Sequence, residues 1–312
     1  MSPSPPFELV RDLPDPARHD HATAREQLDS RPGRPTLHDL RVGAERYRPN
    51  HGLRLAINTA LAVDAPLLLT GDPGTGKTQV AYYLEWYFDS KVFAFQVRST
   101  STARDLKYDF DAVAYLRYAQ QPEAKTEPKT RSDFLYKQAL WQAYEYRAGT
   151  PILLIDEIDK APRDFPNDLL LELDQHRFPH PFEAHEIRPC GQHPPVVVIT
   201  SNAERRLPDA FLRRCVWHRI VLDDDLIDEA VRARVGEFPN LDASTREVAI
   251  NHFKTIRRIE GLIKPPSTAE LLTWLAVLSA RGERLEVDLS PAELPCLGVL
   301  IKDADDLDKL GN

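Results

Sequence analysis

A glycine-rich turn of this chain has the sequence Gly71-Asp72-Pro73-Gly74-Thr75-Gly76-Lys77-Thr78. It follows an apolar run at residues 66–70, and a run with helical character extends from Gln79 to Phe88. A strand, a turn with the pattern G-x-x-x-x-G-K-[ST] and a helix start form the context in which this pattern binds the phosphates of a nucleotide. We therefore expect a nucleotide site at this turn.

The residue types of the turn supply the chemistry of phosphate binding. Gly71, Gly74 and Gly76 permit left-handed backbone angles and close approach, so successive N–H groups can converge on phosphate oxygens. The following helix adds the positive end of its dipole. Lys77 is expected to reach the β- and γ-phosphates, and the Thr78 hydroxyl to ligate Mg²⁺. The candidate nucleotide-binding residues are the eight from Gly71 to Thr78, together with Gln79.

An acidic pair follows a second apolar run. Residues 151–155 are Pro-Ile-Leu-Leu-Ile, and Asp156 and Glu157 come directly after them. Such a run predicts a strand that is buried on both faces and whose carboxyl end opens onto the ligand edge of a parallel sheet. Asp156 is expected to hold Mg²⁺ through its water shell. Glu157 is placed to orient and deprotonate an attacking water.

Three further short apolar or β-branched runs predict strands at residues 92–97, 196–200 and 217–221. The strand at 196–200 delivers Asn202 at its end, where a polar side chain can touch the γ-phosphate and the attacking water. Helical spacing is found at residues 53–61, 134–147, 164–175 and 208–214, and the last of these ends in Arg213 and Arg214. The predicted fold class is α/β.

Two segments between these elements are candidates for functional insertions. Residues 98–133 are too long for a simple connection, and residues 177–195 can form a protruding hairpin. Before the first strand, Tyr47 and Asn50 are possible contacts of an adenine base. A purely structural helix start explains them equally well.

The chain divides by composition into three parts. Residues 1–36 are rich in proline and poor in apolar residues, which is typical of a flexible arm. Residues 37–222 hold the strands and form the expected nucleotide-binding domain. Strand signals end near residue 223, and we expect an α-helical domain over residues 223–312. Its helical patterns lie at residues 226–235, 244–259, 267–280 and 291–300.

Composition restricts the class of protein further. The net charge of −8 argues against a protein that coats nucleic acid, which normally needs a basic face. The three cysteines, Cys190, Cys215 and Cys296, lack C-x-x-C spacing and indicate reduced thiols in the cytoplasm. The first residues lack the pattern of a signal peptide, and no apolar run is long enough to span a bilayer. We expect a cytoplasmic protein without membrane insertion.

This series of motifs resembles the AAA+ ATPases over residues 38–302, and within them the MoxR group. The likeness rests on residues 71–78, 154–158, 200–202 and 207–214. It implies a three-layer P-loop NTPase core with a helical lid domain, and ATP and Mg²⁺ as cofactors. It also implies a homo-oligomeric ring of hexameric type.

The resemblance assigns roles to single residues. Lys77 and Thr78 correspond to the Walker A pair, Asp156 and Glu157 to the Walker B pair, and Asn202 to the first sensor. Arg214 stands where the family has the arginine finger that acts on a neighbouring subunit's nucleotide, and Arg213 is the alternative. One position departs from the family: many relatives have Ser-Pro-Arg at a lid helix start, whereas this chain has Ser267-Thr268-Ala269. Arg257, Arg258 or Lys264 can substitute, and we assign no second sensor.

The resemblance also implies what the ring acts on. Members of the MoxR group usually work with a protein that carries a von Willebrand factor A domain, here encoded separately, and remodel or activate it. The segment from Ser99 to Tyr118 matches the place of the family's helix-2 insertion, and Arg177 to Pro195 matches the hairpin before the first sensor. In the insertion, Tyr108 and Phe110 can either grip a client polypeptide or pack on their own subunit. The alternatives are an ATP-gated switch or scaffold and a nucleic-acid motor. The motor is disfavoured by charge, although Arg98, Arg104 and Lys107 leave a local basic path.

Overall fold

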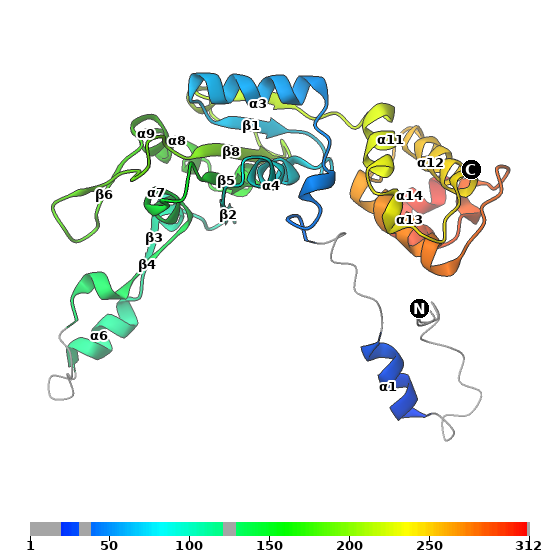
Figure 1. Cartoon of the computed structure of the whole chain (residues 1–312), viewed down its shortest axis with the longest axis horizontal. Coiled ribbons are helices and arrows are strands. Elements are labelled where there is room, and N and C mark those ends of the chain that lie inside the picture. The colour runs from blue at the N-terminus through cyan, green and yellow to red at the C-terminus, as the bar shows by residue number, and fades with distance from the viewer. Residues whose placement is uncertain (1–19, 31–38, 121–128, 311–312) are drawn as a thin grey trace. The chain divides into compact units, whose positions relative to one another are not determined.

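The computed structural model describes residues 20–30, 39–120 and 129–310 (Figure 1). The described residues divide into two compact units, one within residues 49–221 and the other within residues 222–310 together with the described residues up to Arg48. The predicted proline-rich arm at 1–36 lies mostly outside the described residues, apart from α1 (His21–Asp29), which begins after the N-cap Asp20. No helix among the described residues is long and apolar enough to cross a membrane.

A five-stranded, wholly parallel sheet forms the centre of the first unit. Its spatial order is β2 (Val92–Gln96), β5 (Ile152–Asp156), β8 (Val196–Ser201), β1 (Leu67–Thr70) and β9 (Val216–Arg219). Leu153 and Ile155 pack into one hydrophobic core, whereas Leu154 between them faces the opposite side and is 1% exposed. Both faces of the sheet are therefore covered, and the prediction of an α/β P-loop fold is confirmed.

Helices cover the sheet. On β1 and β9 lies α3 (His51–Val63), while α4 (Lys77–Tyr87) contacts β5 and β8, and α7 (Ala139–Glu145) contacts β2 (Figure 1). The start of α3 is set by Asn50, whose side-chain oxygen accepts a hydrogen bond of 2.8 Å from the Leu53 amide. Asn50 thus has the structural role weighed above, and its contact with a base stays a prediction.

The two predicted insertions form small ribbons. The longer one contains α5 (Ala103–Lys107), β3 (Tyr108–Phe110), α6 (Ala112–Gln120), η4 (Arg131–Phe134) and β4 (Leu135–Lys137), and residues 121–128 lie outside the described residues. The shorter one is a hairpin of β6 (Phe178–Pro179) and β7 (Glu186–Ile187). Phe110 packs on Phe182 with ring centroids 4.9 Å apart, and Tyr108 packs on Trp141 at 6.3 Å. Both aromatic side chains therefore have packing partners within this unit.

The prediction of one helix over residues 134–147 was wrong in its first part. Leu135–Lys137 is a strand that pairs antiparallel with Tyr108–Phe110, and α7 begins only at Ala139. The apolar residues have helical spacing, but the partner strand lies far upstream, and such a non-local pairing overrides local periodicity.

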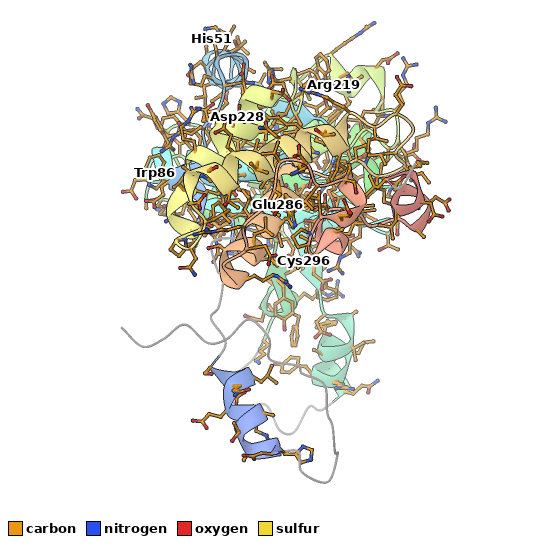
Figure 2. All side chains as sticks on the ribbon, turned by 90° about the vertical axis from the view of Figure 1, so that its right-hand side faces the viewer. His51, Trp86, Arg219, Asp228, Glu286 and Cys296 are labelled. Carbon is orange, nitrogen blue, oxygen red and sulfur yellow. The ribbon has the colours of Figure 1, made fainter. Side chains whose placement is uncertain are left out.

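The second unit is helical, with α11 (Asp224–Arg232), α12 (Ala243–Arg257), α13 (Thr268–Arg281) and α14 (Ala304–Leu310) around the buried Trp274. Asp228, labelled in Figure 2, joins α11 to α12 by accepting a hydrogen bond of 2.7 Å from Lys254. The predicted helix at 291–300 was wrong: the segment forms two 3-10 turns, η7 (Pro291–Glu293) and η8 (Leu297–Val299). Pro295 lacks the N–H that a helix interior needs and breaks the segment.

The geometry of Gly71 gives a first prediction. Its φ is +147°, and a Cβ there would lie 2.4 Å from the Ile220 carbonyl oxygen, whereas Gly149 has a φ of +156° and open space around it. Alanine at either position is strained by the positive φ. Gly71→Ala also brings its Cβ into a clash with the Ile220 carbonyl oxygen, whereas Gly149→Ala meets no such neighbour. We expect it to lower the free energy of unfolding by about 2 kcal/mol more than Gly149→Ala, measured by urea denaturation. If both variants lose the same free energy of unfolding, the close approach of Gly71 to Ile220 does not limit which residue fits at position 71.

Candidate active site

The turn between β1 and α4 has the backbone that a phosphate cradle needs. Gly74 and Gly76 have φ values of 72° and 86°, and Gly76 is the N-cap of α4. Left-handed glycines aim neighbouring N–H groups to one side, as in anion-binding nests. Among the predicted residues, Asp72 and Pro73 are exposed, and Thr75 and Gln79 are buried. All nine predicted nucleotide-binding residues therefore lie in this turn and the first turn of α4.

Lys77 is held inside the loop. It is 6% exposed, and its Nζ donates hydrogen bonds of 2.8 Å to the carbonyl oxygens of Gly71 and Asp72. Burial lowers the pKa of Lys77, and the carboxylates of Asp72, Asp159, Asp156 and Glu157 act in the opposite direction. A buried ammonium gains most from an anionic partner, because charge-assisted hydrogen bonds are stronger than those to carbonyl oxygens.

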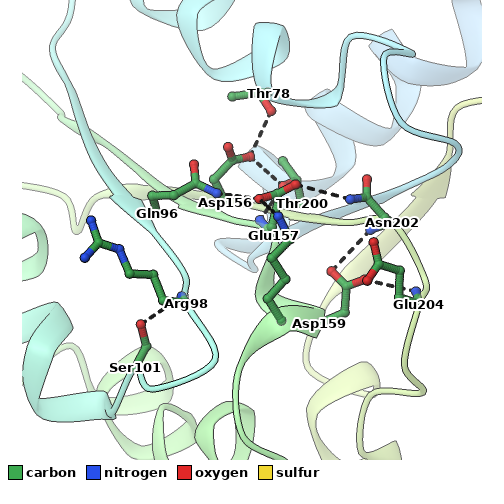
Figure 3. Close-up of polar contacts among 11 residues, drawn as sticks. Thr78, Gln96, Arg98, Ser101, Asp156, Glu157, Asp159, Thr200, Asn202 and Glu204 are labelled. Carbon is green, nitrogen blue, oxygen red and sulfur yellow. Dashed lines mark hydrogen bonds and ion pairs between the residues drawn. The ribbon is translucent and has the colours of Figure 1, made fainter. Parts of the chain in front are cut away.

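Asp156 joins the phosphate loop to the strands (Figure 3). Its Oδ1 accepts hydrogen bonds from the hydroxyl of Thr78 at 2.8 Å and from that of Thr200 at 2.6 Å. Thr200 in turn accepts a bond of 2.8 Å from the amide of Glu157. A hydroxyl beside a carboxylate fits Mg²⁺, which prefers hard oxygen ligands and keeps several of its waters. Thr78 and Asp156 are the residues that would hold it.

Three side chains converge on the carboxylate of Glu157. Gln96, at the end of β2, donates to Oε2 at 2.6 Å, Lys160 forms an ion pair with the same oxygen, and Asn202 donates to Oε1 at 3.3 Å (Figure 3). Glu157 itself has a φ of 59°, in the left-handed region that non-glycine residues seldom occupy. The structure thus brings the predicted base and the predicted sensor together at the carboxyl edge of the sheet.

The two candidate arginines lie elsewhere. Both follow α10 (Asp209–Leu212) and are exposed. Arg214 donates to Asp174 at 2.7 Å and to the carbonyl of Ala210 at 2.9 Å, whereas the side chain of Arg213 has no hydrogen bond or ion pair among the described residues. Within the described part of the chain, no hydrogen bond or ion pair connects either arginine with the carboxylates of the site.

Sequence reasoning missed three residues of this network, Gln96, Thr200 and Lys160. Gln96 and Thr200 are polar residues in or at the end of a predicted strand, and neighbouring parallel strands end at the same edge. The position of Gln96 and Thr200 near the ends of predicted strands was therefore the sequence signal that could have identified them. The pairing of β2 with β5 sets Gln96 opposite Asp156, which the sequence does not show.

A cluster outside this network has side chains that bind metals in other proteins. His180, Glu183 and His185 lie close together at the β6–β7 hairpin. The Nδ1 of His180 accepts hydrogen bonds from the amides of Phe182 and Glu183, and the two imidazole rings stack with centroids 4.7 Å apart. One donor atom of each of the three side chains lies within 4.8 Å of the other two, and this group is separate from the network around Asp156.

Thr200 provides the second prediction. It is 1% exposed, and Thr200→Val removes the donor to Asp156 and the acceptor for the Glu157 amide. We expect a loss of about 1–3 kcal/mol in the free energy of unfolding, because the partly buried amide of Glu157 is left without its partner. Thr59→Val is the control, since the exposed Thr59 hydroxyl bonds only to the Leu55 carbonyl of its own helix. If both variants are equally stable, the network does not contribute to stability.

Residues 66–215 match the AAA domain of the dynein-related subfamily. Over 197 residues, 61% of this chain, the sequence is 25% identical to the Lon protease of Finegoldia magna, and the match spans 23% of the length of that protein. A crystal structure of a Cytophaga hutchinsonii protein, described as a proposed ATPase, covers 74% of both chains at 14% identity and a TM-score of 0.38, too low to support an argument. The domain match, the parallel sheet and the phosphate-binding turn identify residues 66–215 as an AAA+ domain with the α/β P-loop fold.

Proposed function

We propose that this chain binds ATP with Mg²⁺ and hydrolyses it. The observation that supports this most is the network in which Asp156 joins Thr78 of the phosphate-binding turn to Thr200, and Thr200 joins Glu157. The loop amides and Lys77 bind the phosphates. Thr78 and Asp156 would hold Mg²⁺, which would neutralise negative charge on the phosphates.

Glu157 and Asn202 act on the attacking water. The Glu157 carboxylate accepts its proton, and the Asn202 amide aligns it with the γ-phosphate. Gln96, Lys160 and Asn202 take three of the about four lone-pair positions of the Glu157 carboxylate, so they restrain the base and leave it little capacity for the attacking water. This competition slows basal turnover.

The assignment of the base gives the third prediction. Glu157→Gln preserves size and removes the proton acceptor, so we expect kcat to fall about 10²- to 10⁴-fold. Affinity for ATP, read from calorimetry with Mg²⁺, should change less than about threefold, because Glu157 does not bind the phosphates. Glu145→Gln is the control, since Glu145 lies on the surface and pairs with Lys137. Hydrolysis at the parent rate would exclude Glu157 as the base, and absence of ATP binding by the parent chain would refute the proposed function.

We further propose that the chain assembles into a homo-oligomeric ring. AAA+ domains commonly assemble so that an arginine of one protomer completes the site of the next, and the exposure of Arg213 and Arg214, away from their own site, supports such a role. The resemblance to the MoxR group supports a hexameric ring that remodels a separate protein, one with a von Willebrand factor A domain. Arg214 first has to leave Asp174, whereas the side chain of Arg213 pairs with no carboxylate in the described part of the chain.

A mixing experiment distinguishes the two arginines and is the fourth prediction. We expect Arg214→Ala to retain ATP binding and lose about 10³-fold in kcat. A mixture of Arg214→Ala and Glu157→Gln should regain ATPase activity. In a mixed ring, the Glu157→Gln protomer supplies the arginine, and the neighbouring Arg214→Ala protomer supplies the base. Arg206→Ala is the control, since exposed Arg206 pairs with Asp209 alone. If Arg213→Ala shows this complementation instead, Arg213 is the finger; if neither does, the shared site is refuted.

The restraint on Glu157 also favours a second candidate, an ATP-gated switch or scaffold. In that case ATP binding assembles a complex, and slow hydrolysis resets it. Steady-state ATPase rates separate the two functions. A remodelling enzyme continues to turn over in the presence of its partner, whereas a switch stalls after one round.

A further inference from the structure

We propose that Asp159 is a positioning residue that sets the Asn202 side chain against Glu157; this inference rests on the proposed function. Asp159 is 3% exposed. Its Oδ1 accepts a hydrogen bond of 3.2 Å from the backbone amide of Asn202, and its Oδ2 one of 3.0 Å from that of Glu204 (Figure 3). A carboxylate two residues after the base thus holds the main chain of the loop that carries the sensor.

The loop is shaped to receive an anion. Between the two bonded amides lies Ala203, a non-glycine residue with a φ of 59°. A left-handed residue within a turn directs the flanking N–H groups to one side, which is the geometry of an anion-binding nest. Here the anion is the carboxylate of Asp159. Ser201 adds a further bond, because its Oγ accepts from the Ala203 amide at 3.0 Å.

These bonds fix the position of the segment after β5, which carries Glu157 and Asp159, relative to the end of β8 and the loop that carries Asn202. The amide of Glu157 bonds to Thr200, its carboxylate accepts from the Asn202 side chain, and Asp159 accepts from the Asn202 main chain. Ile158, 1% exposed, anchors the turn between the two acids in the core. Without Asp159, Asn202 would keep its side chain but lose the main-chain bond that directs it. Misplacement of a catalytic group by about 1 Å can cost about 100-fold in rate.

The test uses the full-length chain and Asp159→Asn. An amide retains one acceptor but presents an N–H₂ group to an N–H donor, so one of the two loop bonds is lost. We expect kcat to fall about 10- to 100-fold, and hydrogen exchange of the Asn202 and Glu204 amides to become faster. The control is Asp168→Asn in α8 (Phe165–Asp168), because Asp168 is exposed and should change neither quantity.

Affinity for ATP is read separately, because Asp159 also favours the charged form of Lys77. A positioning role leaves the Kd for ATP within about threefold of the parent value. A large rise in Kd with kcat unchanged would place the effect at Lys77 and overturn the proposal.

A double-mutant cycle with Asn202→Ala decides between positioning and plain stability. If Asp159 acts through Asn202, Asp159→Asn should change kcat less than about twofold once that side chain is gone. A purely structural residue lowers kcat by the same factor in both backgrounds, and that additivity would refute the inference. If the parent chain binds and hydrolyses ATP, and Asp159→Asn has the parent's kcat and amide hydrogen exchange, the positioning role of Asp159 is refuted and the proposed function stands. A parent chain without ATPase activity would refute the proposed function as well.

Discussion

One carboxylate oxygen connects the parts of this nucleotide-binding unit. Oδ1 of Asp156 accepts hydrogen bonds from Thr78 at the start of α4 and from Thr200 on β8, while Asp156 itself ends β5. Three elements that are remote in sequence therefore meet at one atom. Because the sheet is parallel and each of its strands ends at the same edge, the chain can gather such groups there without any special loop.

The edge also concentrates charge. Lys77 is buried among loop carbonyls, and Asp156, Glu157 and Asp159 follow one another within four residues. Buried charges are stable only when they are paired or hydrogen-bonded, and each of these has such partners: loop carbonyls for Lys77, hydroxyls for Asp156, and backbone amides for Asp159. These pairings hold Lys77 and the carboxylates at fixed positions on the edge of the sheet.

Much of this could be predicted from the sequence, because the signals are local. The turn at Gly71–Thr78 and the acids after β5 have fixed spacing, and the apolar strands are short and continuous. The rest depends on contacts between distant segments. Gln96 meets Glu157 because β2 pairs with β5, and Leu135–Lys137 is a strand because β3 lies beside it. Periodicity does not reveal such pairings. The break at Pro295 is a local signal, but the apolar spacing around it is helical and predicts one continuous helix.

Under the proposed function, the backbone of Glu157 shows how stability and activity oppose each other at one position. A residue other than glycine at a φ of 59° costs about 1–2 kcal/mol. Glycine would remove that cost together with the carboxylate. Under the proposed function, glutamate at this position therefore lowers stability but supplies the base. Searches for stabilising substitutions should therefore exclude this position, where the most stable residue is the least useful one.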